Sequence, residues 1–257
     1  MRFDDIVKVV GTIPFLPPAD GKLLYDFILA SGRKHILELG FAHGTSTCYM
    51  AAALDEAGRI MGDAQKGEIV TIDNLSAREC IPDIETLLER THLASYVTPI
   101  HSETSYTWEL KRMIEAQTRN HDVQPLFDFC FIDGAHNWET DGLAFFLVEK
   151  LLVPGGWILF DDLDWTYAER PSLRDTPMVK AMPHDVKTTP HIDRIFSLLV
   201  IPHPSFENFR REGRWGWAQK KSGIPSRSVE ALDKVYQDRS IASDAAQLPR
   251  KIYHRFV

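Results

Sequence analysis

Short apolar runs alternate with helical patterns along the first 160 residues, and this alternation constrains the fold more than any other feature. The runs have the length and composition of buried strands: residues 35–39, 68–72, 97–100, 127–132 and 157–160. The segments between them carry helical patterns: residues 45–55, 82–88, 106–116 and 140–152. Strands that alternate with helices form right-handed βαβ crossovers and a parallel sheet with helices on both faces. The sequence therefore predicts a doubly wound α/β sheet.

The pattern changes after Asp164. The proline-rich residues 171–190 have little periodicity and predict a long loop or lid. Residues 194–201 and 214–220 read as two strands, which would form an antiparallel hairpin at one edge of the sheet. We therefore expect a mostly parallel sheet with an antiparallel C-terminal hairpin.

These patterns suggest the domain organisation. We expect one domain over residues 1–222, with a lid insertion around residues 164–190. Residues 223–257 are expected to be a C-terminal helical extension, with one helix near residues 229–237 that packs on the domain or on a second subunit of a homo-oligomer.

Composition narrows the class of protein. The 257 residues are 44% hydrophobic and carry a formal charge of −7, which argues against binding to nucleic acid or to an anionic membrane. The basic and aromatic run at residues 209–221 could suggest nucleic acid, but its place in the predicted hairpin favours a solvated strand pair. No apolar run is long enough to span a bilayer. With three cysteines that lack metal-like spacing, we expect a cytoplasmic protein with reduced thiols.

A glycine turn follows the first predicted strand. The sequence ELGFAHGTST, residues 38–47, places Gly40 and Gly44 where the chain turns from strand to helix, so that backbone N–H groups can approach a ligand. The spacing differs from both the dinucleotide-binding fingerprint and the Walker A loop. It resembles the first motif of class I S-adenosylmethionine-dependent methyltransferases, a Rossmann-like family. The resemblance implies that Glu38, Gly40, Ala42 and Gly44 cradle the amino-acid end of the cofactor, with Ala42 where a second glycine is common.

Polar residues follow the next two strands. Asp73 ends the second strand, where an acid can accept hydrogen bonds from both ribose hydroxyls of a nucleoside cofactor. Its alternative role is a helix N-cap. Ser102 follows the third strand, where methyltransferases of this class often contact adenine, although it could equally be a loop residue.

Acids also end the fourth and fifth strands. Asp133 follows one strand, Asp161 and Asp162 follow the next, and His136 lies three residues after Asp133. Neighbouring carboxylates repel one another unless a cation joins them or one is protonated. Carboxylate oxygens suit Mg²⁺ or a similar divalent cation. The alternative is that Asp161 or Asp162 caps the following turn.

The sequences IDGAH and LLVPGGWILFDD resemble divalent-metal-dependent O-methyltransferases of the catechol and macrolide-sugar types. The resemblance implies that Asp133, Asp161 and Asp162 hold the metal, that Asp133 also borders the cofactor, and that His136 is the general base. His136 could instead be a helix-start residue or a further metal ligand. Asp162 departs from the Asp-Asn pair of the catechol type.

The leading hypothesis is an S-adenosylmethionine-dependent, metal-assisted O-methyltransferase for a small hydroxylated natural product, either phenolic or sugar-bearing. Two alternatives share the fold: a cephalosporin-hydroxylase-like oxygenation, and an accessory protein that binds the cofactor without catalysis. Trp138, Trp165 and Tyr167 flank the acids and would either form an apolar wall for a ring substrate or pack within the protein.

Overall fold

A seven-stranded sheet forms the centre of the computed structural model, which describes residues 1–61 and 66–223. The strand order is β3-β2-β1-β6-β7-β9-β8. The bounds are β1 His35–Leu39, β2 Glu68–Asn74, β3 Val97–Ser102, β6 Phe127–Ile132, β7 Leu152–Phe160, β8 Phe206–Glu212 and β9 Trp215–Lys220. The first five of these are parallel to one another, and β9 pairs antiparallel with both β7 and β8. The predicted fold class is confirmed. The predicted helix at residues 229–237 and the C-terminal extension lie outside the described residues.

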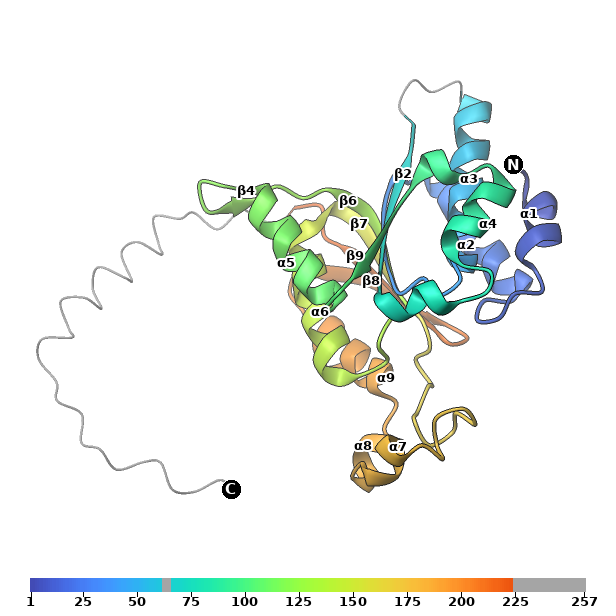
Figure 1. Cartoon of the computed structure of the whole chain (residues 1–257). Helices are drawn as coiled ribbons and strands as arrows, with labels where there is room; N and C mark the ends of the chain where they lie inside the picture. Colours follow the sequence, from blue (N-terminus) through green and yellow to red (C-terminus); the bar gives the residue numbers. More distant parts are fainter. Residues whose placement is uncertain (62–65, 224–257) are drawn as a thin grey trace, which may run out of the picture. The chain divides into compact units, whose positions relative to one another are not determined.

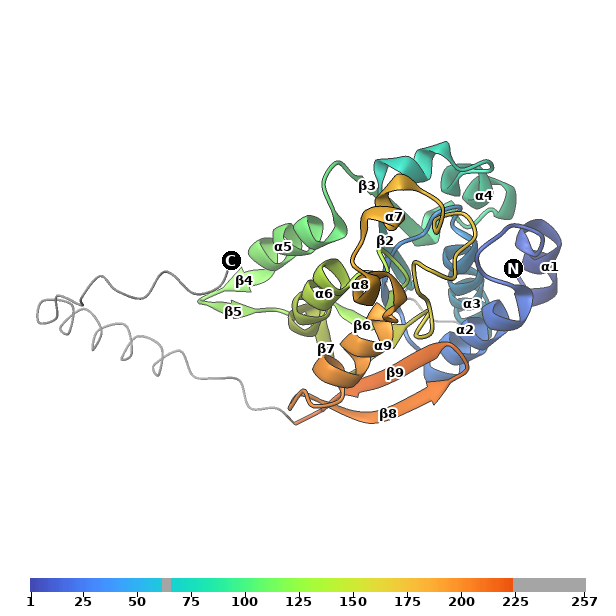
Figure 2. The same cartoon turned by 90° about the horizontal axis from the view of Figure 1, so that it is seen from below.

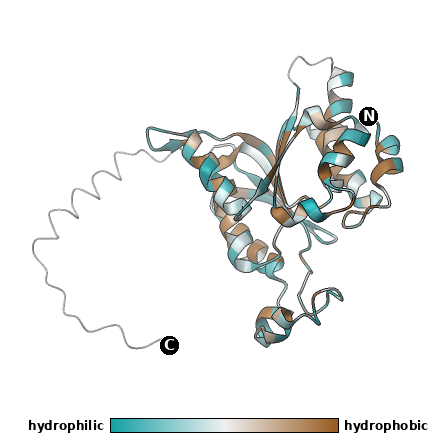
Figure 3. Cartoon of the chain, viewed as in Figure 1, coloured by the Kyte–Doolittle hydropathy of each residue, from teal (hydrophilic) through white to brown (hydrophobic). Residues whose placement is uncertain are grey.

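Helices cover both faces of the sheet (Figure 1). One layer consists of α1 Phe3–Val10, α2 Pro18–Ser31, α3 Thr45–Met61 and α4 Ile84–Thr91, and the other is built mainly of α5 Tyr106–Gln117, α6 Trp138–Leu151 and α9 His191–Ile195. Successive residues of a strand serve opposite layers: Phe129 and Phe131 pack with the first, whereas Cys130 and Ile132 pack with the second. Apolar colouring is accordingly concentrated on the strands and on the inner sides of the helices (Figure 3). No described helix has both the length and the apolar character needed to cross a membrane.

The hairpin prediction was right for one strand and wrong for the other. Residues 214–220 correspond to β9, but the apolar run at residues 194–201 is helical, and the second hairpin strand is β8. The buried positions Ile192, Ile195, Phe196 and Val200 follow the i, i+3, i+4, i+8 pattern, which places them on one face of a helix. The solvated strand pair is also half correct, since β8 is largely exposed whereas Trp215 and Trp217 of β9 are buried.

The segment predicted as a long loop contains two short helices, α7 Pro177–Ala181 and α8 His184–Thr188. Its ends are joined by a hydrogen bond from the Ala168 N–H to the Lys187 carbonyl, 2.9 Å. Trp165, Tyr167 and Val179 form a small apolar cluster of its own. This segment lies beyond the carboxyl ends of the parallel strands, at the bottom of Figure 1, and in the view from below it lies in front of them (Figure 2). It is therefore a small folded insertion.

Candidate active site

A cavity of about 640 Å³ lies at the carboxyl ends of β1, β2, β6 and β7. In open α/β sheets ligands bind at this edge, next to the point where the strand order reverses, which is between β1 and β6 here. Its lining residues come from seven places: the segment before α2, the glycine turn, the end of β2, the start of α5, the ends of β6 and β7, the insertion after β7 and the turn between β8 and β9. The charged ones are Asp73, Asp133, Asp161, Asp162, Arg170 and Arg214, with His43 and His136 beside them.

The glycine turn forms one wall of this cavity. Gly40 and Gly44 both have φ of +89°, a backbone conformation that favours glycine. A Cβ on Gly40 would lie 2.0 Å from the Asp133 carbonyl oxygen, and a Cβ on Gly44 would collide with Ile84. Both glycines are therefore required for the turn to lie against its neighbours. Ala42, also at positive φ, lines the cavity between them.

Glu38 lies behind the turn and does not line the cavity. It is fully buried, and its carboxylate accepts hydrogen bonds from the hydroxyls of Ser46, Thr47 and Thr71. Burial raises the pKa of Glu38 to about 7, although the three hydroxyls oppose that rise. Glu38 thus joins β1, β2 and the start of α3, and acts on the turn from within the protein.

Asp73 connects the turn to β2. Its Oδ2 accepts hydrogen bonds from the backbone N–H groups of Phe41 and Ala42, both 2.8 Å, and its Oδ1 accepts one from the N–H of Asn74, 2.7 Å. A carboxylate has about four acceptor sites, so one remains for a ligand in the cavity. Ser102, by contrast, is buried outside the cavity lining, where its hydroxyl donates to Glu109, 2.9 Å.

Asp133, His136 and Asp162 form a group of possible metal ligands in the cavity. One potential ligand atom from each lies within 4.8 Å of the other two. The Nε2 of His136 is 3.1 Å from Asp162 Oδ2 and 3.5 Å from Asp133 Oδ1, but it makes no hydrogen bond of good geometry with the described residues. His136 and Asp162 both have positive φ, 54° and 55°. Such strained conformations gather at functional sites.

Asp161 is directed elsewhere. Its Oδ2 accepts a hydrogen bond from the Arg214 guanidinium, 2.9 Å, and its Oδ1 accepts one from the Trp215 indole, 2.8 Å. The same guanidinium donates to Asp162 Oδ1, 3.1 Å. Burial raises the pKa of Asp161 and the charge of Asp133 raises it further, whereas Arg214 opposes both effects. The sequence predicted three aspartates around one metal; the structure brings together Asp133, Asp162 and His136, and pairs Asp161 with Arg214.

The sequence matches a known family over this part of the chain. The family model described as a methyltransferase domain matches residues 37–163, which run from β1 past the acidic pair after β7. Residues 37–163 are a methyltransferase domain. No curated protein matches the chain significantly.

Solved structures with this methyltransferase fold resemble the chain at low identity. They include an O-methyltransferase from Bacillus cereus in complex with SAH, with 20% identity, a TM-score of 0.54 and coverage of 85% of this chain and 90% of that one. The O-methyltransferase TomG from Streptomyces achromogenes, in complex with SAM, has 16% identity, a TM-score of 0.55 and coverage of 85% and 89%. A putative caffeoyl-CoA O-methyltransferase from Staphylococcus aureus has 17% identity, a TM-score of 0.57 and coverage of 86% and 92%. The class I fold is thus confirmed.

The 640 Å³ cavity contains two arginines, Arg170 and Arg214, that the sequence patterns did not indicate. Arg214 lies in the turn between β8 and β9, some fifty residues after the aspartates that it contacts. Arg170 belongs to the insertion, and its guanidinium lies 3.2 Å from Asp162 Oδ2 and 5.6 Å from the centre of the Trp165 ring. The signal in the sequence was the Asp161–Asp162 pair itself. Buried carboxylates require a counter-charge, so a cationic side chain from elsewhere in the chain could have been expected beside them.

The pKa values of His136 and Asp162 depend on the charged side chains around them. Burial lowers the pKa of His136, but Asp133 and Asp162 raise it more, to about 10. Burial acts to raise the pKa of Asp162, yet His136, Arg214 and Arg170 bring it below its ordinary value. In the protein alone, His136 is therefore an imidazolium between two carboxylates near neutral pH. The Trp165 ring is stacked on it, with the centroids 5.0 Å apart.

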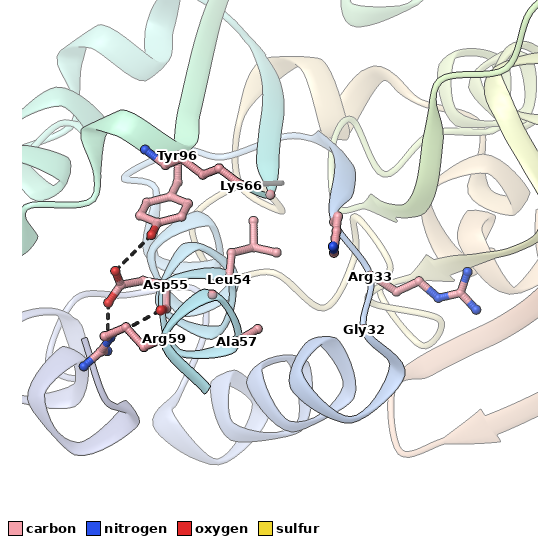
Figure 4. A pocket seen from close by; sticks show the side chains of 11 residues that line it. Gly32, Arg33, Leu54, Asp55, Ala57, Arg59, Lys66 and Tyr96 are labelled. Carbon is pink, nitrogen blue, oxygen red and sulfur yellow. Dashed lines mark hydrogen bonds and ion pairs between the residues drawn. The ribbon is translucent and has the colours of Figure 1, made fainter. Parts of the chain in front are cut away.

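A second cavity, of about 330 Å³, lies at the opposite end of the strands, beside the residues that precede β1, β2 and β3 (Figure 4). Asp55 on its wall accepts hydrogen bonds from Arg59, 2.8 Å, and from the Tyr96 hydroxyl, 3.0 Å. Lys66 lies over the Tyr96 ring, 4.2 Å from its centre. These side chains already interact with one another, so the 640 Å³ cavity is the stronger candidate for the active site.

Proposed function

We propose that this methyltransferase transfers a methyl group from S-adenosylmethionine to a hydroxyl of a small metabolite, with help from a divalent cation. The observation that carries this proposal is the composition of one cavity. The glycine turn and Asp73, which suit the cofactor, line the same 640 Å³ space as Asp133, His136 and Asp162, which suit a cation.

The cofactor fits this cavity for two reasons. The positive φ angles of Gly40 and Gly44 let the turn curve tightly between Asp133 and Ile84, and Gly40 and Ala42 line the cavity with little side chain between a nucleoside cofactor and the backbone. Asp73 retains one acceptor site beside the turn, as a ribose hydroxyl would require. Asp73 would therefore bind the ribose while also holding the turn that surrounds the rest of the cofactor.

A divalent cation fits Asp133, His136 and Asp162. Two carboxylates and one imidazole are an ordinary donor set for such an ion. The buried Nε2 of His136 lacks a hydrogen bond with the described residues although two carboxylates lie within 3.5 Å, which is the arrangement expected of a ligand atom. We therefore assign His136 as the third ligand, and Asp161 as the residue that orients Arg214 beside the group.

The chain's own residues would then act on the substrate by position and charge. A bound divalent cation would lower the pKa of the substrate hydroxyl. The glycine turn and Asp73 would hold the cofactor, so that the hydroxyl oxygen and the methyl group meet in line. The Trp165 ring beside His136 offers an apolar surface for the substrate, and Arg170 from the insertion borders the same space.

Transfer of an isotopically labelled methyl group tests this proposal. The protein would be incubated with methyl-labelled S-adenosylmethionine and a fractionated extract of small metabolites, and the products identified by mass. The proposal predicts products that gain one labelled methyl group on oxygen, lost with a chelator and restored by Mg²⁺ or Mn²⁺. A product that gains oxygen without label would indicate oxygenation, and cofactor binding without any turnover would favour the accessory role.

A further inference from the structure

Two backbone N–H groups on either side of His136 are held by one buried pair of side chains, Tyr106 and Asp141. The N–H of Ala135 donates to the Tyr106 hydroxyl, 3.1 Å, and the N–H of Asn137 donates to Asp141 Oδ2, 3.1 Å. The Tyr106 hydroxyl in turn donates to Asp141 Oδ1. His136 itself has φ of 54°, so the strained residue lies between the two fixed N–H groups.

This pair is built into the protein interior. Asp141 is fully buried in α6. Tyr106 is 7% exposed at the start of α5, where it also borders the cavity, so the contact joins two helices that pack side by side. Burial and the charge of Asp141 raise the pKa of Tyr106, which keeps its hydroxyl available as a donor. The ring also explains Gly134, because a Cβ there would lie 2.6 Å from Tyr106 Cε1.

We propose that Tyr106 and Asp141 are positioning residues that set the place of His136 in the cation site. A left-handed conformation is strained at a residue other than glycine, and persists only where its surroundings impose it. The hydroxyl and the carboxylate supply that constraint on both sides of His136. Without it, the turn would relax and the imidazole would move away from Asp133 and Asp162. This role rests on the proposed function, since it concerns the ion that His136 would bind.

Tyr106→Phe is the informative variant, because it removes the hydroxyl and keeps the ring that packs on Gly134. We expect Mn²⁺ affinity, measured by calorimetry on the chelated and dialysed protein, to fall roughly 10- to 100-fold, as is typical for outer partners of metal ligands. S-adenosylhomocysteine affinity should change less than about twofold. Tyr25→Phe is the matched control, since it removes a hydroxyl–carboxylate hydrogen bond from Tyr25 in α2 to Glu56 in α3 and should change neither affinity.

Amide hydrogen exchange separates this inference from the metal assignment. Tyr106→Phe should accelerate exchange of the segment that contains Ala135 and Asn137, and leave other segments as in wild type. If wild type binds no Mn²⁺ but this exchange change is seen, the metal part of the proposed function fails and the positioning of the turn stands. Unchanged exchange in that segment, or an equal loss of Mn²⁺ and cofactor affinity through general destabilisation, would overturn the inference.

Discussion

The Nε2 atom of His136 lies 3.1 Å from Oδ2 of Asp162 and makes no hydrogen bond of good geometry with the described residues. Arg214 meanwhile donates to both carboxylates of the acidic pair, at 2.9 Å to Asp161 and 3.1 Å to Asp162. The two aspartates are thus unequal: both accept hydrogen bonds from arginine, but only Asp162 has a carboxylate oxygen beside the imidazole, whereas the second oxygen of Asp161 accepts from the Trp215 indole.

This inequality predicts a ranking of metal affinities. Asp162→Asn should weaken Mn²⁺ binding at least about tenfold, as expected when a charged ligand is removed, whereas Asp161→Asn should weaken it less. Because the pKa of His136 is raised to about 10, ligation must displace a proton near neutral pH, and affinity should rise with pH. Titration of Mn²⁺ into each variant at several pH values measures both effects. Equal losses in the two variants would support the three-aspartate arrangement instead.

Removal of Arg214 should destabilise the fold. Its guanidinium is the counter-charge of Asp161, which is 1% exposed, and it also lies 3.5 Å from Asp20 in α2. Loss of one partner of a buried ion pair costs about 3 kcal/mol. Arg214→Gln should therefore lower the free energy of unfolding, measured in urea, by about that amount. Arg211→Gln, which removes a half-exposed guanidinium paired with Asp193, is the control and should cost less than about 1 kcal/mol. Similar losses in both variants would show that Asp161 does not depend on Arg214.

The insertion after β7 should resist proteolysis because of its own apolar cluster. Val179 is 1% exposed in that cluster, whereas its neighbour Met178 is 56% exposed. Val179→Ala should destabilise the insertion locally by about 1–2 kcal/mol and speed cleavage within residues 168–187 roughly tenfold. Met178→Ala should leave cleavage unchanged. Equal cleavage rates for both variants and wild type would mean that the apolar cluster does not stabilise the insertion.

Glu38 should make stability depend on pH. Its pKa is raised from 4.5 to about 7 in the folded protein, so its contribution to stability is fully present below about pH 4.5 and is lost as the pH rises through 7. The loss amounts to about 3 kcal/mol. Urea unfolding of wild type and Glu38→Gln between pH 5 and 8 isolates this contribution, because the other groups are common to both. Parallel curves would show that the carboxyl titrates normally.

Local sequence patterns predicted the strands and the ends that carry the acids, because a parallel sheet places the carboxyl ends of its strands at one edge. These patterns alone predicted that Asp73 and Asp133 lie at the ligand-binding edge of the sheet, and both line the cavity. Patterns could not show that Glu38 is buried behind the turn, since that depends on the hydroxyls of α3 and β2 that surround it.

Long-range packing decided what the sequence left open. Arg214 reaches Asp161 because β9 pairs antiparallel with β7, and the Tyr106–Asp141 contact exists because α5 packs on α6. The apolar run at residues 194–201 was misassigned because its composition suits a strand, while the spacing of its buried residues is helical. The two contacts depend on how elements that are distant in the chain pack together, and this packing cannot be deduced from local sequence patterns.

Calorimetric titration of S-adenosylmethionine into the purified protein tests the central claim most directly. The account predicts one binding site, unaffected by chelation because the glycine turn and Asp73 hold the cofactor apart from the cation group. Asp73→Ala should weaken binding about tenfold to a hundredfold, through loss of the ribose hydrogen bond and of the carboxylate that holds the turn. No binding by the wild-type protein would contradict the account, and equal affinity of the Asp73→Ala variant would contradict the role given to Asp73.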